Sequence, residues 1–180
     1  MQRISIADIK KNNIGCVDEN DELKLYCYDE CSNDSSIEKK LSRGIVVDKK
    51  ENIVFQGLPY SDEFVVKEGD QYNIEDIKNT CFFNSYEGSL IRVFCHNDKW
   101  YTTTHHKLDA FNSKWASTQS FGDIFKNGVG KKYGTLFDNM DKKNGYLFLT
   151  ENNSENRLVC NVMEVPNVYH VATIKDNNIV

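Results

Sequence analysis

The sequence has 180 residues and a mass of 20.8 kDa, the size of one ordinary domain. Hydrophobic residues make up 39% and charged residues 27%, a balance that supplies a core and excludes a disordered or fibrous chain. The net charge of −5 argues against a protein that coats nucleic acid through its phosphates, because that mode of binding needs a basic surface. We therefore expect a single domain over residues 1–180.

Neither a membrane span nor a secretory signal is evident. No segment approaches the roughly 20 consecutive apolar residues that cross a bilayer. Asp8, Lys10 and Lys11 stand where a secretory signal needs an apolar run. The sequence thus predicts a cytoplasmic protein, with reduced cysteines and no membrane partner.

The first half of the chain carries strand patterns. Residues 23–28 (LKLYCY) alternate as a half-buried strand, and the polar run 29–40 is typical of a loop with a short helix at its end. Residues 44–48 and 52–57 are two apolar segments separated by a short polar turn. This spacing predicts an antiparallel hairpin.

The second half combines strands with helical spacing. Residues 89–94 and 100–104 flank a turn at His96, Asn97 and Asp98, which predicts a second hairpin. Between 117 and 141 the apolar residues recur at three-and-four spacing, which favours two short helices. Strand patterns then return in three segments: 145–149, 157–162 and 168–174. The fold class predicted is α+β, with largely antiparallel sheets and a few short helices.

Six cysteines are spread along the chain, and three of them could be considered as zinc ligands. Cys16, Cys27 and Cys31 lie within one region, but the spacing is CxxxC and a fourth ligand is missing nearby. Tyr26 and Tyr28 alternate around Cys27 as they would on a strand. We therefore predict no metal site.

His105 and His106 are adjacent, after the second strand of the predicted hairpin. If that strand continued through them, their side chains would point to opposite faces and could not chelate one metal. Neither histidine has a serine or cysteine at a spacing that indicates a hydrolase. A structural role is favoured by these local features.

Three separated segments carry a resemblance to a known family. They are LSRGIVVD at 41–48, YEGSLIRVF at 86–94 and YLFLTENNSENRLV at 146–159. In order and spacing they resemble the nucleotidyltransferase domain of phage-type RNA ligases and mRNA-capping enzymes. The resemblance spans about residues 23–174 and implies that superfamily's fold for the whole chain.

The same resemblance implies that the family's covalent step is lost. The family motif is Lys-x-Asp/Glu-Gly, whose lysine attacks the α-phosphate of ATP or GTP beside a metal ion. Here the corresponding residues are Ser85, Tyr86, Glu87 and Gly88, so the nucleophilic lysine is replaced by serine. The third segment has Leu-Thr at 149–150 where a glutamate is usual. The family's later metal- and phosphate-binding motifs do not occur before the chain ends.

The resemblance implies a pocket that binds a purine nucleotide or an RNA 5′ end, with the mRNA cap as one candidate. Aromatic side chains would stack on the base, and arginines would face phosphate. Arg92 alternates with Leu90 and Phe94, so it is expected to point inward and to need an anionic partner, from protein or phosphate. Packing in the core is the alternative role of the aromatics. The predicted binding residues are Arg43, Tyr86, Glu87, Arg92, Trp100, His105, Lys107, Trp115 and Arg157.

Three functions follow as hypotheses. The first is an inactive RNA-ligase-like domain of a large DNA virus, which needs no cofactor and acts on viral mRNA translation or processing in the host cytoplasm. The second is an active RNA ligase or guanylyltransferase that uses Lys107 or Lys78 as nucleophile, with ATP or GTP and Mg²⁺. The third is a protein-interaction module on a ligase-like scaffold.

Overall fold

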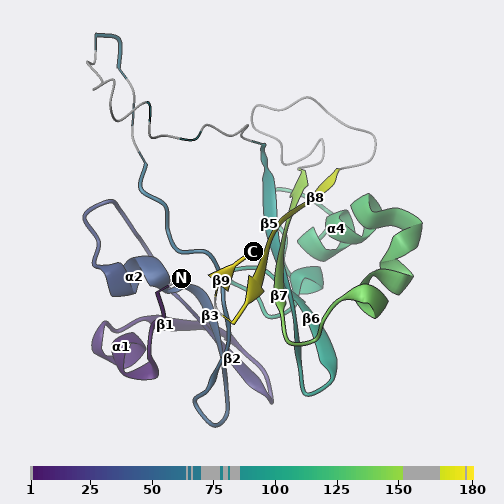
Figure 1. The fold of residues 1–180 in the computed structure, drawn as a ribbon, viewed down its shortest axis with the longest axis horizontal. Helices are drawn as coiled ribbons and strands as arrows, with labels where there is room; N and C mark the ends of the chain where they lie inside the picture. Colours follow the sequence, from purple (N-terminus) through teal and green to yellow (C-terminus); the bar gives the residue numbers. More distant parts are fainter. Residues whose placement is uncertain are drawn as a thin grey trace.

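The structure is a computed structural model that describes residues 2–63, 65, 67–69, 78, 81, 86–151, 167–176 and 178–180. It contains two antiparallel sheets and a few short helices, so the predicted α+β class is confirmed (Figure 1). Among the described residues, no helix is both long enough and apolar enough to span a bilayer.

The first sheet has four strands in sequence order, and the two early helices lie beside it (Figure 1). Its elements are α1 (Ile6–Lys11), β1 (Gly15–Glu19), β2 (Leu23–Cys27), α2 (Ile37–Leu41), β3 (Arg43–Asp48) and β4 (Ile53–Gln56). Strand β2 alternates between buried Leu23, Leu25 and Cys27 and more exposed neighbours, as its sequence pattern predicts. The predicted β3–β4 hairpin and the short helix before β3 are confirmed.

Helix α1 and strand β1 are not marked by the hydrophobic pattern. The helix begins at a capping box, in which the Ser5 hydroxyl accepts from the Asp8 N–H at 3.1 Å. The Asp8 carboxylate accepts in return from the Ser5 N–H at 3.0 Å. The reciprocal bonds satisfy two N–H groups that the helix itself leaves unpaired. Ile9 then anchors the helix in the core.

The second sheet has the strand order β6-β5-β7-β8-β9. Its strands are β5 (Gly88–His96), β6 (Lys99–Thr103), β7 (Gly145–Glu151), β8 (Val168–Lys175) and β9 (Asn178–Ile179). The predicted β5–β6 hairpin is confirmed, and its two turn residues, Asn97 and Asp98, both have positive φ, 49° and 61°. A two-residue hairpin turn favours this conformation because its twist matches that of the strands. Strand β9 was not predicted.

A helical layer packs on the outer face of the second sheet, on the right in Figure 1. It consists of η1 (Ala110–Asn112), α4 (Phe121–Val129) and η2 (Gly130–Asn139). The prediction of two short helices over 117–141 is confirmed, and the second of them, η2, is a 3-10 helix. Gly130, with φ +64°, ends α4 and changes the direction of the chain.

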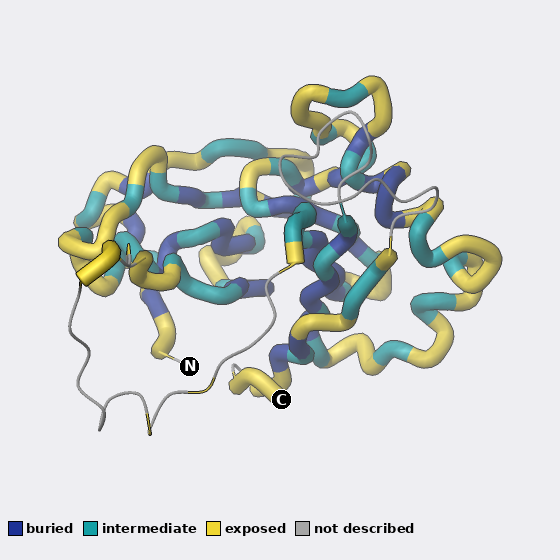
Figure 2. Tube along the Cα trace, turned by 90° about the horizontal axis from the view of Figure 1, so that it is seen from above, coloured by how far each residue is buried: buried dark blue, intermediate teal, exposed yellow. Residues whose placement is uncertain are grey.

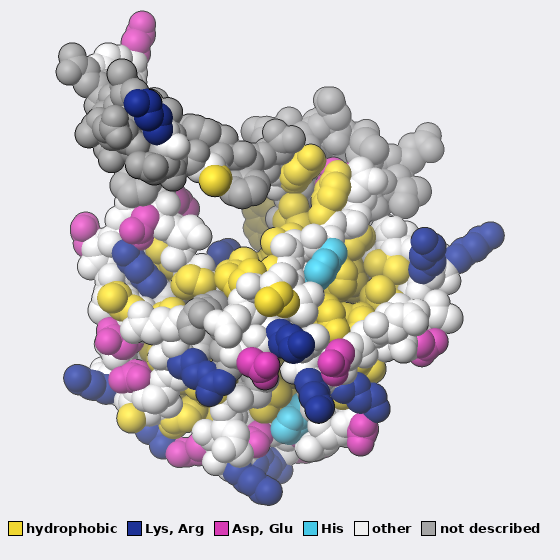
Figure 3. All heavy atoms as spheres, viewed as in Figure 1, with side chains coloured by type: hydrophobic (Ala, Val, Ile, Leu, Met, Phe, Trp, Pro, Cys, Tyr) yellow, Lys and Arg dark blue, Asp and Glu magenta, His cyan; other side chains and the backbone are white. Residues whose placement is uncertain are grey.

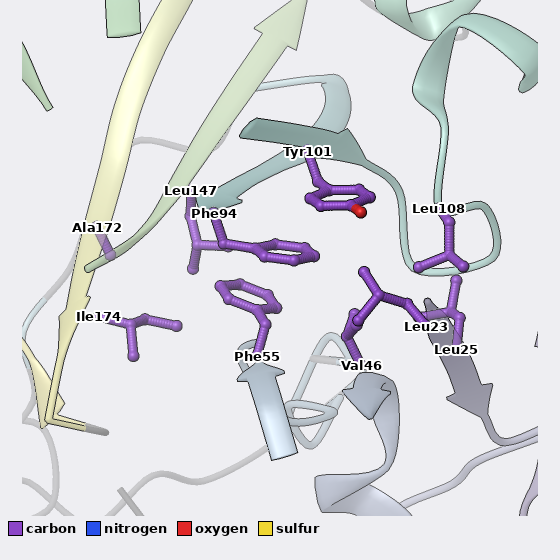
Figure 4. Packing of buried hydrophobic residues seen from close by; sticks show 10 residues of the cluster. All are labelled: Leu23, Leu25, Val46, Phe55, Phe94, Tyr101, Leu108, Leu147, Ala172 and Ile174. Atoms are coloured by element: carbon purple, nitrogen blue, oxygen red, sulfur yellow. The ribbon is translucent and has the colours of Figure 1, made fainter. Parts of the chain in front are cut away.

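The main core lies between the two sheets, where the trace in Figure 2 is mostly buried. Phe94 of β5 is stacked between Phe55 of β4 and Tyr101 of β6 (Figure 4), with ring centroids at 5.1 and 5.4 Å. Leu25 and Val46 close this cluster from the first sheet. Burial of large apolar surfaces from both sheets fixes how the sheets pack against one another.

Several predictions lie outside the described residues. These are the strand at 157–162, the motif residue Ser85 and the predicted binding residue Arg157.

Candidate functional site

Arg92 of β5 lies fully buried between the two sheets, with 1% of its surface exposed. Its guanidinium donates to the main-chain carbonyl of Arg43 at 2.6 Å and to that of Gly44 at 3.1 Å. Gly44 and Gly57 lie against the group, since a Cβ at Gly57 would come within 3.2 Å of it. The side chain therefore ties the second sheet to the start of β3 in the first. Arg92 points inward, as its alternation predicts.

The charge of Arg92 has no carboxylate partner among the described residues, and its Nε has no hydrogen-bond partner. Burial, and to a smaller extent the nearby Arg43 charge, lower the pKa of Arg92 to about 10. The guanidinium is still a cation at neutral pH. The expected anion is thus replaced by two carbonyl oxygens, which carry only partial negative charge and leave a net positive site.

The turn after β6 brings two histidines to this end of the sheets. Strand β6 ends at Thr103, close to the predicted end at 104, so it does not continue through the two histidines to Lys107. The Thr104 hydroxyl accepts from the main-chain N–H of His106 at 3.3 Å and of Lys107 at 3.0 Å, which closes a turn in place of a strand. The rings of His105 and His106 lie 4.3 Å apart between centroids, so they are not on opposite faces.

Both histidines lie in a positive electrostatic environment. Burial, followed by the charge of Arg92, lowers the pKa of His105 to about 3. Burial and Arg92 also lower the pKa of His106, while Asp29 opposes the shift. Both rings are therefore neutral at pH 7 and can donate or accept hydrogen bonds without adding charge.

Cys27 and Tyr28, at the end of β2, complete this part of the site. Burial raises the pKa of the Cys27 thiol, although Arg92 partly opposes the shift. Burial likewise raises the pKa of Tyr28, opposed by the charge of Arg43. A buried neutral thiol is a poor nucleophile, so Cys27 does not supply covalent chemistry. We call Cys27, Tyr28, Arg43, Arg92, His105 and His106 the inter-sheet site.

The other predicted residues lie elsewhere. Tyr86 and Glu87 are the two residues before β5. The Tyr86 ring stacks on the ring of Tyr169 in β8, with centroids 4.7 Å apart. Trp100 and Lys107 line a separate cleft along β6. Trp115 is 53% exposed in the loop after η1.

Of the predicted set, the structure brings Arg43, Arg92 and His105 together at the inter-sheet site. The other members of the site, Cys27, Tyr28 and His106, were not in the predicted set. None of these three is part of a sequence motif, because packing between elements distant in the chain places them there. Among the described residues, no three His, Cys, Asp or Glu side chains are grouped so that they could hold a metal ion.

The surface differs from this interior. On the face drawn in Figure 3, lysines and arginines are interspersed with aspartates and glutamates, and the described residues of this face form no continuous basic patch. Inside the protein, Arg92 is a buried cation, and Arg43 beside it is partly buried. This arrangement suits one local anionic group better than a long phosphate backbone.

Comparison with known proteins finds relatives in iridoviruses. The chain is 36% identical over 174 residues to the "Immediate-early protein ICP-46 homolog" of Invertebrate iridescent virus 6, covering 87% of this chain and 38% of that protein. It is 31% identical over 159 residues to the protein of the same name in Invertebrate iridescent virus 3, covering 82% of the chain and 36% of that protein.

A third relative comes from a virus of vertebrates. The "Immediate-early protein ICP-46" of Frog virus 3 (isolate Goorha) is 31% identical over 131 residues, covering 63% of this chain and 32% of that protein. The chain thus spans less than two fifths of the length of these relatives. No protein-family profile matches the sequence. The relatives support the prediction of a viral protein.

Proposed function

We propose that this chain is an RNA-ligase-like nucleotidyltransferase domain that has lost covalent catalysis and binds the phosphate of a nucleotide or of an RNA 5′ end. The observation that carries the proposal is the buried cation of Arg92, which has no carboxylate partner among the described residues. It lies in a chain of net charge −5. An isolated buried charge is costly unless an opposite charge is bound nearby, and phosphate would supply one.

The residues of the inter-sheet site have distinct roles in this proposal. Arg92 is too buried to touch a ligand, so it acts through its field and by holding the main chain of Arg43 and Gly44. Arg43 is only partly buried and would contact the phosphate directly. His106 is exposed and would donate from its neutral ring. Glu87 and Tyr86, which the resemblance assigns to the base, lie outside the inter-sheet site, and the Tyr86 ring stacks on that of Tyr169. They take no part in the phosphate contact proposed here.

A binding role is favoured over an enzymatic one. The motif position is Ser85, which has no amine, and the alternative nucleophile Lys107 lies 3.6 Å from the Asp18 carboxylate in an ion pair. An amine that attacks phosphate must be unprotonated, whereas an ion pair is formed by the ammonium. We propose that the domain acts in the host cytoplasm, on the translation or processing of viral mRNA.

The test combines thermal stabilisation with intact mass. The protein is incubated with ATP, GTP, a methylated cap analogue or a short 5′-phosphorylated RNA, with and without Mg²⁺. A ligand that binds only the folded state at a hundredfold excess over its Kd adds about 2.7 kcal/mol of stability. We expect a rise in Tm without added mass.

Variants locate the site. Arg43→Ala should abolish the rise in Tm. Lys50→Ala removes the same charge from the turn after β3, about 16 Å along the strand from Arg43, and should leave the rise intact. A covalent adduct that disappears in Lys107→Ala would establish the enzyme alternative. No response to any ligand would overturn nucleotide binding and favour a protein partner.

A further inference from the structure

A second concave site lies beside the inter-sheet site, along the edge strand β6. Its volume is about 580 Å³, within the range of pockets that hold small molecules. The end of β1 and the turn after it form one wall, and the 3-10 helices η1 and η2 contribute to the other. We call it the β6 cleft.

The walls of the β6 cleft are rich in aromatic rings. Trp100, Phe111, Tyr133 and Phe137 all line it, and each is only partly buried. Trp100 stacks on Phe137 with ring centroids 5.5 Å apart, and Tyr133 meets Phe137 edge-on at 5.7 Å. Unlike the stacked rings of the main core, these side chains keep surface exposed inside a concavity. Such surfaces suit a flat ring that stacks on them.

Hydrogen bonds hold these walls in place. The Asp109 carboxylate accepts from the Phe111 N–H at 2.9 Å and from the Asn112 side chain at 2.8 Å. The Asp18 carboxylate accepts from the Leu108 N–H at 2.8 Å across the cleft's end. A ligand would therefore meet a largely preformed surface and lose little binding energy in ordering it.

The charges in the cleft select a base over a phosphate. Asp18, Glu19 and Asp109 line it, against the ammonium groups of Lys99 and Lys107. This excess of carboxylates would repel phosphate, whereas it leaves a neutral base ring unaffected. The ammonium of Lys99 lies over the ring of Tyr101, two residues later in β6, at 4.8 Å from the ring centroid.

The chain itself connects the two sites. His105 belongs to the inter-sheet site, and Lys107, two residues later, lines the β6 cleft. Two residues span at most about 7 Å between their Cα atoms. Trp100 lies near the start of β6, five residues before His105 and so about 16 Å from it along the strand. An oligonucleotide of a few nucleotides can span this distance.

From this arrangement we infer that the β6 cleft binds a base of an RNA strand whose 5′ phosphate lies at the inter-sheet site. The inference rests on the proposed function, which allows either a nucleotide or an RNA 5′ end as ligand, and it narrows that ligand to an RNA strand. Recognition is by stacking on Trp100 and its aromatic neighbours, with Lys107 beside the backbone between the two sites. Because every base has a flat face, binding in the cleft tolerates different sequences.

The test uses the two tryptophans of the chain as separate reporters. In Trp115→Phe the fluorescence comes from Trp100 alone, and in Trp100→Phe it comes from Trp115 alone. A 5′-phosphorylated mononucleotide and 5′-phosphorylated RNAs of increasing length are titrated into both variants. We expect quenching of Trp100 by the RNAs, and none by the mononucleotide. Quenching of Trp115 in place of Trp100 would overturn the inference.

Affinity gives the second readout. Trp100→Ala should weaken binding of the RNAs by about 5- to 150-fold, the worth of one stacked base. It should leave mononucleotide binding unchanged, which also shows that the variant is folded. Arg43→Ala should weaken binding of both ligands.

These outcomes separate the two proposals. If the mononucleotide binds in an Arg43-dependent manner but longer RNAs bind no better, the β6 cleft inference fails and the proposed function stands. If neither ligand binds, both proposals fail. The outer edge of β6, which pairs with no further strand among the described residues, then becomes a candidate for binding a strand of a protein partner.

Discussion

The packing around Arg92 makes a strong prediction for Gly44→Ala. Gly44 has φ +76°, a conformation that costs an alanine about 1 kcal/mol. The new Cβ would lie 1.8 Å from Arg92 Nη1 and 2.9 Å from the Cα of His105. The guanidinium would have to move, breaking buried hydrogen bonds of a charged group that are worth about 1.5 to 3 kcal/mol each.

We therefore expect Gly44→Ala to lower the free energy of unfolding by about 4 to 7 kcal/mol, from the backbone cost and the two hydrogen bonds together. This is a large part of the 5 to 15 kcal/mol typical of a domain. Urea denaturation measures the change: with a slope of about 2 kcal/mol per M, the midpoint should fall by roughly 2 to 3.5 M. Gly134→Ala is the matched control, because Gly134 has no positive φ and its Cβ would have no neighbour within 4 Å. A midpoint for Gly44→Ala close to that of Gly134→Ala would refute the described packing.

Three further predictions concern stability. The pKa of His105 is about 3 in the folded state and 6.5 when unperturbed, so below pH 6.5 the unfolded chain binds a proton that the folded chain does not. The free energy of unfolding should therefore fall as the pH drops from 6.5 towards about 4.5, by at most about 1.4 kcal/mol per pH unit. His105→Gln should reduce that slope in urea titrations, and an unchanged slope would contradict the burial that lowers this pKa. Ser5→Ala removes the cap of α1 and should cost about 1 kcal/mol, whereas Ser113→Ala, in a loop, should cost little; equal midpoints in urea would argue against the capping box. Phe94→Ala removes the central ring of the stack and should lower the free energy of unfolding by about 3 to 5 kcal/mol. Val171→Ala changes a side chain of β8 that is 48% exposed, and calorimetry should show almost no change in its Tm. Similar Tm values for the two variants would contradict the core in Figure 4.

The binding proposals depend on how buried charge is arranged. An interior cation with no carboxylate partner among the described residues would suit a ligand with a single concentrated negative group. The β6 cleft adds aromatic surface at a short distance along the chain. If both proposals hold, the two sites would distinguish an RNA end from a free nucleotide by length, since only a strand would occupy both.

Local patterns in the sequence determined most of the strands. The β3–β4 and β5–β6 hairpins were predicted because strand alternation and turn residues such as Asn97 act over a few positions. The inward direction of Arg92 followed from the same alternation. Helix α1 was missed because its capping box spans only Ser5 to Asp8, and its six residues carry little apolar pattern.

The sequence by itself thus determined the α+β class, the hairpins and the burial of Arg92. Only the tertiary structure decided what Arg92 contacts, because its partner carbonyl at Gly44 is 48 positions away in the chain. It likewise decided that His105 lies in a turn and that Trp100 lines a cleft with Tyr133. Periodicity reports which face of an element is buried, whereas contacts between distant elements depend on how the two sheets and the helical layer pack.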